Sequence, residues 1–400
     1  MMFFVRTRFS ILLLVLEFSS SFSYIKSYGA LHRRRSHSTL FLEMSSTSAA
    51  QDLLYQDQQA AMERRALQEQ KLLSTKKVKE LKAPKLKIPA PKSGTGFGGG
   101  ASTKKSSMSA LQRLASEQAK IVHREGVIRI NQALSSDQSD KLREYILEQQ
   151  SLASIETAKD LSISKAFYGV ENQRKNRCDL QLSLLQGGFA ADNGGDTSST
   201  DSHVLADVLQ QLLGKDGTLG SLFENLVTME GEFYELASVI TNPGSPRQIV
   251  HPDLPHKKIA PLYVVFLALQ DVNEFMGPTT FLLRTHTIKE NDIFNDHSQK
   301  DQQLATADSR LATLKKGDAV LFDARILHCG NANDADKGFD RALFNFSFRN
   351  PKVQGSLGYA GSIRSGYTGA MTLRDMREVL VAYGEGDNDA FAKYGDGISR

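Results

Sequence analysis

The sequence predicts a mainly β domain with flanking helices, built as a jelly roll or a β-sandwich. From residue 231 onward, short apolar stretches alternate with turns rich in Pro, Gly, Asn and Asp. The expected strands read EFYELASVITN, RQIVH, PLYVVFLALQ, TTFLLR, DAVLFD, RILHCG and RALFNFSFRN. No GxGxxG turn follows any of these strands, so a dinucleotide-binding fold has no support.

Helices are expected before the strands, where they would pack on one sheet. SALQRLASEQAK predicts a helix that leads into a short strand from Gly126 to Ile130. Ser135 or Ser136 is the expected N-cap of the amphipathic helix that follows. Two more helices are expected over residues 204–213 and 221–227, and the end of ENQRKNRCDLQLSLL alternates like a strand.

The last expected strand has two chemically different faces. Because side chains alternate along a strand, Phe344, Phe346 and Phe348 share one face, whereas Arg341, Asn345, Ser347 and Arg349 share the other. One face therefore meets an apolar core and the other a polar environment. PLYVVFLALQ is apolar at every position but the last, which is typical of a central strand covered on both faces.

Composition favours one large globular domain with appendages. The chain has 400 residues, 40% of them hydrophobic, and a net charge of +4. Its two cysteines, Cys178 and Cys329, are too few for a disulfide framework or a cysteine-rich zinc site.

The N-terminal residues are typical of a targeting sequence. Arg6 and Arg8 precede a short apolar run, and residues 18–42 then contain basic residues and serines but no acidic residue. Residues 1–42 thus resemble a bipartite signal and transit presequence for a plastid, with a secretory signal or a mitochondrial presequence as the alternatives. No other stretch is long and apolar enough to span a membrane, so the mature protein is expected to lack a transmembrane segment.

Residues 43–108 are expected to form an appendage without a core of its own. QDLLYQDQQAAMERRALQEQKLL predicts a solvent-exposed helix, and a linker rich in Lys, Pro and Gly follows it. Phe97 is the only aromatic residue in this basic linker, so no nucleic-acid partner is expected. The main domain is placed at residues 109–383, and residues 384–400 form a C-terminal tail.

His251 and Asp253 form a His-x-Asp pair at the end of an expected strand. Two such alternate side chains can point an imidazole and a carboxylate at one metal ion. His328, 75 residues after Asp253, stands at the end of another expected strand. Two histidines and one carboxylate form a facial triad that suits Fe(II) and leaves positions open for a co-substrate and O2.

Arg341 is the candidate for an anion site. It begins the strand after His328 and lies on that strand's polar face. A keto acid such as 2-oxoglutarate would bind the iron at one end and need a cation for its far carboxylate, which a guanidinium binds bidentately.

Four segments carry a resemblance to a known family: SPRQIVHPDLPH, GPTTFLLRTHT, LKKGDAVLFDARILHCGNAN and DRALFNFSFRN. In this order they resemble the phytanoyl-CoA dioxygenase family of Fe(II)- and 2-oxoglutarate-dependent oxygenases, over roughly residues 120–350. The resemblance implies a cupin-like double-stranded β-helix core. It also implies His251, Asp253 and His328 as catalytic iron ligands and Arg341 as the 2-oxoglutarate anchor. Where the family often has Gly-Ser-His, this chain has Arg284-Thr285-His286.

The implied activity is hydroxylation of a C–H bond in a small or lipid-like substrate, with succinate and CO2 as co-products. Fe(II), 2-oxoglutarate and O2 are the expected cofactors, with ascorbate as a helpful reductant, and a small molecule or acyl compound is the expected partner. Halogenating relatives have Gly or Ala in place of the carboxylate, so Asp253 favours hydroxylation. The alternatives are a prolyl-hydroxylase-like oxygenase, which usually anchors 2-oxoglutarate through Lys, and a catalytically silent binding protein of jelly-roll fold.

The neighbouring polar residues are expected to have other roles. His256 and His286 are interpreted as hydrogen-bonding residues rather than ligands. Cys329 should point away from the metal, because it follows His328 directly in a strand.

Overall fold

The computed structural model describes residues 60–74, 78–86, 109–159, 175–182, 184, 203–358, 371–387, 390 and 391. The chain divides into two compact units, one of Met1–Ala61 with Gly355–Ala360 and one of Met62–Gln354 with Gly361–Arg400. The described part of the first unit is limited to residues 60, 61 and 355–358. The presequence expected over residues 1–42 lies outside the described residues. The strands and the four predicted site residues belong to the second unit.

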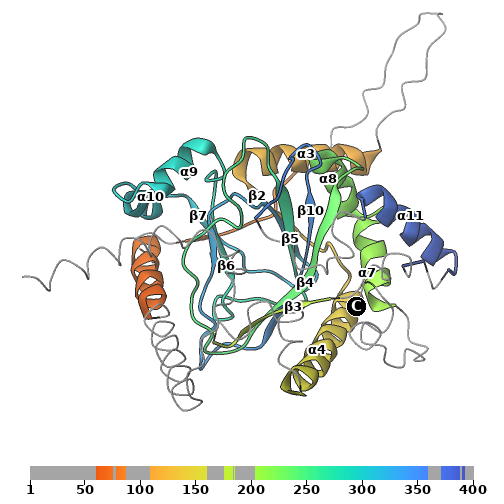
Figure 1. Cartoon of the computed structure of the whole chain (residues 1–400), viewed down its shortest axis with the longest axis horizontal. Coiled ribbons are helices and arrows are strands. Elements are labelled where there is room, and N and C mark those ends of the chain that lie inside the picture. The colour runs from red at the N-terminus through yellow and green to blue at the C-terminus, as the bar shows by residue number, and fades with distance from the viewer. Residues whose placement is uncertain are drawn as a thin grey trace, which may run out of the picture. The chain divides into compact units, whose positions relative to one another are not determined.

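Two sheets form the centre of the second unit (Figure 1). The six-stranded sheet has the order β2 (Val127–Ile130), β8 (Ala319–Asp323), β5 (Leu262–Ala268), β10 (Arg341–Arg349), β4 (Glu232–Thr241) and β3 (Arg177–Gln181). The four-stranded sheet has the order β1 (Lys79–Glu80), β7 (Ser309–Leu311), β6 (Thr279–Leu282) and β9 (His328–Gly330).

The chain crosses repeatedly between the two sheets as it runs from β5 to β10. Strands β5, β8 and β10 lie in the six-stranded sheet, whereas β6, β7 and β9 lie in the four-stranded one. All pairs among these strands are antiparallel. This interleaved winding is that of a double-stranded β-helix, and it confirms the expected jelly roll with flanking helices.

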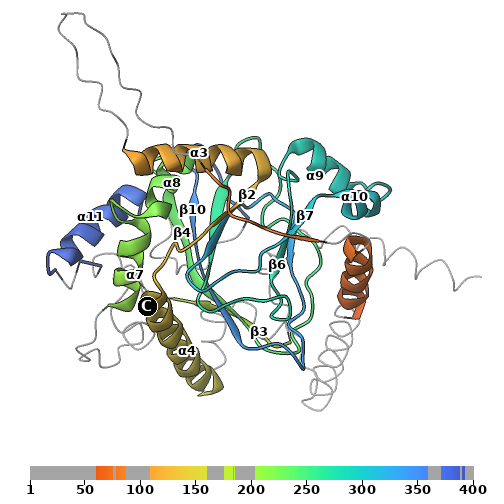
Figure 2. The ribbon, with the colours of Figure 1, turned by 180° about the vertical axis from the view of Figure 1, so that it is seen from behind.

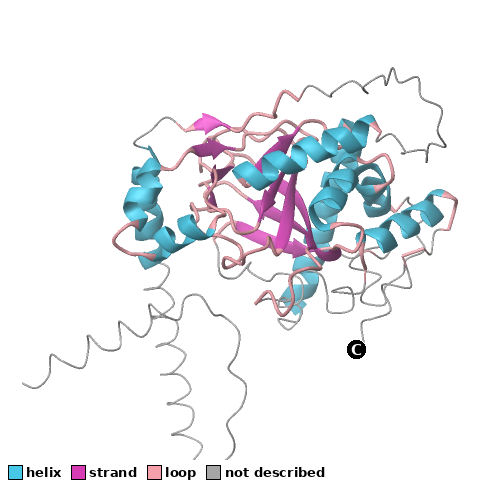
Figure 3. Ribbon diagram, turned by 90° about the horizontal axis from the view of Figure 1, so that it is seen from above, coloured by secondary structure: helices cyan, strands magenta, loops and turns pink. Residues whose placement is uncertain are grey.

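The helices flank the sheets, as Figure 3 shows. Their bounds are α3 (Ala110–Glu125), α4 (Ser136–Lys159), α7 (Val204–Leu213), α8 (Thr218–Val227), α9 (Ile288–Asn295), α10 (Lys300–Thr306) and α11 (Leu373–Gly384). Ser109 caps α3 through a capping box, and Ser135 Oγ accepts the N–H of Gln138 at the start of α4. The short helices α9 and α10, inserted between β6 and β7, had no predicted counterpart.

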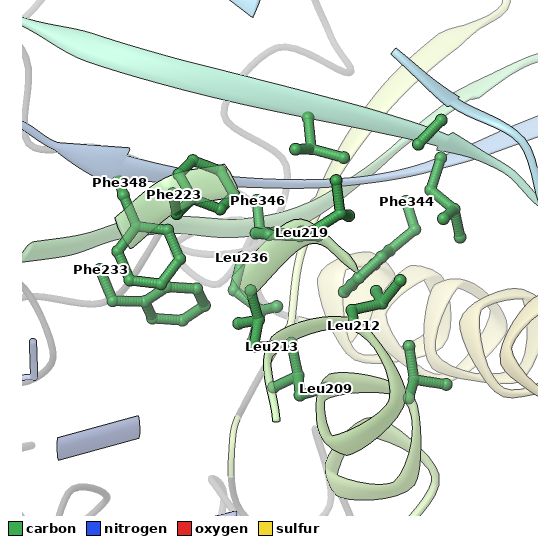
Figure 4. Close-up of a cluster of buried hydrophobic side chains, with 14 of the residues drawn as sticks. Leu209, Leu212, Leu213, Leu219, Phe223, Phe233, Leu236, Phe344, Phe346 and Phe348 are labelled. Atoms are coloured by element: carbon green, nitrogen blue, oxygen red, sulfur yellow. The ribbon is translucent and has the colours of Figure 1, made fainter. Parts of the chain in front are cut away.

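The main apolar core lies between the six-stranded sheet and the helices. Phe344, Phe346 and Phe348 of β10 all face Phe223 of α8 and the leucines of α7 (Figure 4). The ring centroids of Phe223 and Phe348 are 4.7 Å apart. The predicted apolar face of β10 is therefore confirmed, and its polar face turns toward the second sheet, where Arg341 donates to the carbonyl of Gly277 just before β6.

The prediction of a regular strand over RQIVH is wrong. Residues 246–250 form no strand, and His251 forms an isolated antiparallel bridge with His328. Pro246 and Pro252 bracket this stretch, and neither can donate a backbone hydrogen bond to a ladder.

The segment before residue 109 is more structured than expected. A helix spans residues 60–74, and its part within the second unit, residues 62–74, is called the pre-domain helix below. The prediction of a helix is confirmed, but its full exposure is wrong, because Ala66, Glu69 and Leu73 are buried. Lys79–Glu80 of the expected linker pair with β7 as an edge strand. Among the described residues, no helix combines the length and apolar character needed to cross a membrane.

Candidate metal and anion site

The backbone brings His251 and His328 directly opposite each other. Each donates its N–H to the carbonyl oxygen of the other, with both N···O distances at 2.9 Å. This isolated bridge places the two imidazole centroids 4.7 Å apart. Two residues that are 77 positions apart in sequence thus meet because β9 returns alongside the His-Pro-Asp segment.

Asp253 completes a compact group of three possible ligands. Its Oδ1 lies 3.3 Å from Nε2 of His328 and 3.9 Å from Nε2 of His251. One ligand atom from each of the three residues lies within 4.8 Å of the others. Spacing of this kind lets three ligands occupy one face of a single ion.

Each imidazole is oriented by its own backbone. Nδ1 of His251 lies 2.8 Å from the carbonyl oxygen of Ile249, and Nδ1 of His328 lies 3.0 Å from that of Ile326. Because a carbonyl oxygen only accepts, each Nδ1 must carry the hydrogen. Nε2 is then the ring nitrogen on the side of Asp253, and it is the atom that each imidazole can offer to a metal ion.

The three residues differ in their surroundings. His328 is buried against the rings of Phe281 and Phe322, with centroid distances of 5.8 and 5.2 Å. Burial disfavours its charged form, but the Asp253 carboxylate and the hydrogen bonds of the ring outweigh this and raise the pKa of His328. His251 and Asp253 keep about a third of their side-chain surface exposed, 31% and 29%. The group is therefore closed behind His328 and open beside Asp253.

Arg341 is a buried cation without a carboxylate partner among the described residues. Its Nη1 donates to the carbonyl of Gly277, and its Nε has no hydrogen-bond partner. Burial, together with the nearby guanidinium of Arg177, lowers the pKa of Arg341 to about 9. A buried guanidinium in this state is stabilised by an anionic ligand.

Arg177 is a second cation at this site, and sequence reasoning missed it. Arg177 on β3 and Arg341 on β10 both pair with Thr241 of the intervening strand β4. The hydroxyl oxygen of Thr241 is buried and has no partner in the described part of the chain. No sequence signal marked Arg177, because its position beside Arg341 follows from the order β10-β4-β3 in the sheet.

Strand β9 connects the two parts of the site. His328 begins it, and at its other end a Cβ on Gly330 would lie 3.4 Å from Nη2 of Arg177. Two residues of β-strand span roughly 7 Å. The anion site therefore lies a short, fixed distance along β9 from the ligand group.

The Arg284-Thr285-His286 segment forms a tight turn. Arg284 adopts a left-handed backbone conformation with φ of 67°, at the position where glycine is common in the family that the sequence resembles. Its guanidinium pairs with Glu125 at 2.6 Å and Asp308 at 3.2 Å. His286 is buried and its Nε2 contacts the carbonyl of His123, which confirms its interpretation as a hydrogen-bonding residue.

The remaining neighbours take structural roles. Cys329 is buried in an apolar cluster with Val250 and Leu327, so it points away from the ligand group as expected. A groove of about 840 Å³ lies elsewhere, between α3 and residues 78–84, and its lining contains neither the ligand group nor Arg341.

The residues fit a divalent metal ion and a dicarboxylate. Two imidazoles and one carboxylate converge within 4.8 Å of one another, which is a donor set suited to Fe(II). The unpartnered Nε of Arg341 and the unpartnered hydroxyl of Thr241 provide the complementary anion site.

Comparisons with known proteins give one family. A sequence profile described as Phytanoyl-CoA dioxygenase (PhyH) matches residues 122–342. No curated protein matches the sequence.

Three solved structures represent the similar folds. The non-heme alpha ketoglutarate dependent epimerase SnoN from nogalamycin biosynthesis has 16% identity and a TM-score of 0.40, covering 59% of this chain and 83% of SnoN. HygX from Streptomyces hygroscopicus has 13% identity and a TM-score of 0.41, covering 62% of this chain and 95% of HygX. A Pseudomonas putida prolyl-4-hydroxylase has 11% identity and a TM-score of 0.37, covering 60% of this chain and 100% of the hydroxylase.

The family match spans more than half of the chain and contains His251, Asp253, His328 and Arg341. The chain is therefore an enzyme that belongs to the phytanoyl-CoA dioxygenase family, whose members are iron- and 2-oxoglutarate-dependent dioxygenases.

Proposed function

We propose that this enzyme hydroxylates a C–H bond of a small or lipid-like substrate, with 2-oxoglutarate and O2 as co-substrates and succinate and CO2 as co-products. His251, Asp253 and His328 would hold Fe(II), and Arg341 would hold the far carboxylate of 2-oxoglutarate. Bound Fe(II) would supply the coupled activation of O2 and oxidative decarboxylation of the keto acid. Ascorbate is the proposed auxiliary reductant.

The observation that carries the proposal is the unneutralised buried cation at the far end of β9 from His328. A five-carbon dicarboxylate can place one end at the ligand group and its other end beside Arg341 and Arg177. Because both arginines are held by the sheet, they bind this carboxylate without being reorganised.

The other side chains shape the site around the reacting atoms. Phe281 and Phe322 cover the buried side of His328 and exclude water there. The partly exposed side beside His251 and Asp253 is the one through which a substrate would enter. The carboxylate of Asp253 occupies the third ligand position, which favours hydroxylation over halogenation.

The test measures succinate formation by the full-length chain supplied with Fe(II), ascorbate and 2-oxoglutarate, across a panel of acyl-CoA esters and small polar compounds. We expect substrate-dependent succinate and hydroxylated product, and loss of both in the Asp253→Ala variant. Binding of 2-oxoglutarate to the Ni(II)-loaded chain is measured separately by calorimetry. Absence of 2-oxoglutarate binding would contradict the proposal, whereas binding without turnover of any panel member would favour the catalytically silent alternative.

A further inference from the structure

The pre-domain helix carries a fully buried carboxylate. Glu69 has 0% of its surface exposed, although Glu63 on the same helix is exposed. The helix lies outside residues 122–342, the part matched by the family profile. A buried glutamate is costly unless its charge is paired and its oxygens are hydrogen-bonded, so its contacts indicate what it does.

Glu69 bonds directly to the segment that carries a predicted metal ligand. Its Oε2 accepts the backbone N–H of Val250 at 2.6 Å. Val250 immediately precedes His251, whose own N–H is bonded to His328. Among the described residues, no strand pairs with this segment at Val250, and Glu69 supplies the hydrogen bond that a neighbouring strand would give.

The second oxygen of Glu69 is held by cations. Oε1 lies 2.9 Å from Nε of Arg65 and 3.9 Å from Nζ of Lys300. The same helix is tied to α10, because Nη2 of Arg65 lies 2.8 Å and Nε2 of Gln68 lies 3.1 Å from the carboxylate of Asp301. Figures 1 and 2 both show this helix beside α10. The carboxylate is thus anchored through Oε1 independently of the hydrogen bond that Oε2 accepts from Val250.

Apolar packing supports the same two segments. Leu73 of the pre-domain helix lies in one buried cluster with Val250, Leu327 and Cys329. These three residues adjoin His251 and His328 in sequence, and strand alternation turns their side chains away from the ligand side. The helix therefore packs behind both histidine-bearing segments.

We propose that Glu69 is a positioning residue for the metal site. It fixes the backbone at Val250, so that the imidazole of His251 stays opposite His328 and Asp253. This inference rests on the proposed function insofar as the three residues bind a divalent metal ion. It extends the site to a residue about 180 positions away from His251, in a segment that the sequence predicted to be a solvent-exposed helix.

The experiment compares three full-length variants with the parent chain: Glu69→Ala, Glu69→Gln and the exposed control Glu63→Ala. Co(II) affinity is measured from the visible absorption of the bound ion, and amide hydrogen exchange is measured at Val250 and His251. We expect Glu69→Ala to weaken Co(II) binding by about 10- to 100-fold, the range found when an outer partner of a metal ligand is removed. The exchange of Val250 should accelerate in parallel. Glu69→Gln retains an oxygen acceptor, so its Co(II) affinity should stay within about threefold of the parent value. Glu63→Ala should bind Co(II) like the parent.

The outcomes separate the two proposals. Parental Co(II) affinity in a folded Glu69→Ala would overturn the role of Glu69 and leave the proposed function intact. If Glu69→Ala does not fold, the Glu69→Gln variant decides. A loss of Co(II) affinity of tenfold or more in Glu69→Gln overturns the claim that the hydrogen bond from Val250 positions the site. Near-parental Co(II) affinity in Glu69→Gln supports that claim. A parent chain that binds neither Co(II) nor 2-oxoglutarate refutes the proposed function and with it the positioning role.

Discussion

Individual side chains at this site are fixed by specific backbone contacts. His251 and His328 are each oriented at Nδ1 by a carbonyl two residues earlier in the chain. Arg341 is held by the carbonyl of Gly277 and keeps its Nε unused. At this scale, backbone contacts hold the two imidazoles and the guanidinium in place before any ligand binds.

The geometry of the Arg341 guanidinium should matter as much as its charge. In Arg341→Lys the cation remains, but the planar fork that grips a carboxylate with two parallel hydrogen bonds is lost. We expect the dissociation constant of 2-oxoglutarate, measured by calorimetry on Ni(II)-loaded protein, to rise by about tenfold or more, equivalent to about 1.4 kcal/mol per tenfold. The control Arg374→Lys, at an exposed arginine on α11, should leave the dissociation constant of 2-oxoglutarate unchanged. An unchanged dissociation constant in Arg341→Lys would mean that Arg341 does not bind the far carboxylate.

Two short elements depend on a single side chain each. The turn at residues 284–286 is closed by Thr285, whose hydroxyl donates to the carbonyl of Leu282 at 2.7 Å and accepts the N–H of Leu327 at 2.9 Å. Helix α7 begins at His203, whose Nδ1 accepts the N–H of Ala206 while Nε2 lies 2.6 Å from the carbonyl of Leu184. Both side chains are buried, so water cannot replace them.

Thr285→Val should destabilise the fold, because the isosteric change leaves a buried N–H and a buried C=O without partners. The expected loss of unfolding free energy is about 1–3 kcal/mol in urea titrations. Thr313→Val is the matched control, since its hydroxyl bonds Glu80 at an exposed position and its loss should cost less than about 0.5 kcal/mol. Equal stability of Thr285→Val and the parent would show that the hydroxyl does not hold the turn.

His203 should make stability depend on pH. Burial lowers the pKa of His203 below its ordinary value, despite the opposing hydrogen bond to Leu184. The unfolded chain therefore takes up this proton more readily, and unfolding free energy should fall as pH drops below about 6.5. His203→Asn keeps a capping acceptor but does not titrate, so its stability should fall less between pH 7.5 and 5.5. The exposed control His297→Asn should retain the parental pH dependence, and an equally steep fall in His203→Asn would contradict the assignment.

At the scale of the whole domain, the six-stranded sheet separates an apolar core on one face from a polar interior on the other. One face of the six-stranded sheet packs on helices through a continuous apolar core. The other face turns buried polar atoms such as those of Arg341, Asn345 and Ser347 toward the second sheet, and three of these atoms have no partner among the described residues. The Arg341 Nε is one of these atoms and lies where a ligand is proposed, so ligand binding should stabilise the fold as a whole.

Metal and 2-oxoglutarate should therefore raise the unfolding temperature together. A ligand that binds only the folded state at a concentration 100 times its dissociation constant contributes about 2.7 kcal/mol, or an increase of roughly 5–10 °C for a domain of this size. Thermal unfolding with Ni(II) and 2-oxoglutarate should show this increase, and a chelator should reverse it. The His328→Ala variant should show no increase. Parental unfolding temperatures in the presence of both ligands would mean that the site does not bind them.

Much of the fold was predictable from local pattern. Alternation and turn residues indicated eight of the described strands, all but β1 and β7, because strand periodicity and chain reversal are short-range properties of the sequence. His251, Asp253, His328 and Arg341 were identifiable for a related reason, since their chemistry and their offsets from strand ends are visible in the sequence. The structure brings the first three together and leaves Arg341 buried with an unused Nε.

Arg177 and Glu69 could not be found in this way. Arg177 lies beside Arg341 only because β4 separates β3 from β10 in the sheet. Glu69 occupies an unremarkable position in a polar helix, and its burial arises from the docking of that helix on α10 and on the segment before His251. Strand order and helix docking result from long-range packing, whose free energy depends on surfaces far apart in sequence. The local sequence around Arg177 and Glu69 therefore does not predict these contacts, and only the tertiary structure determines them.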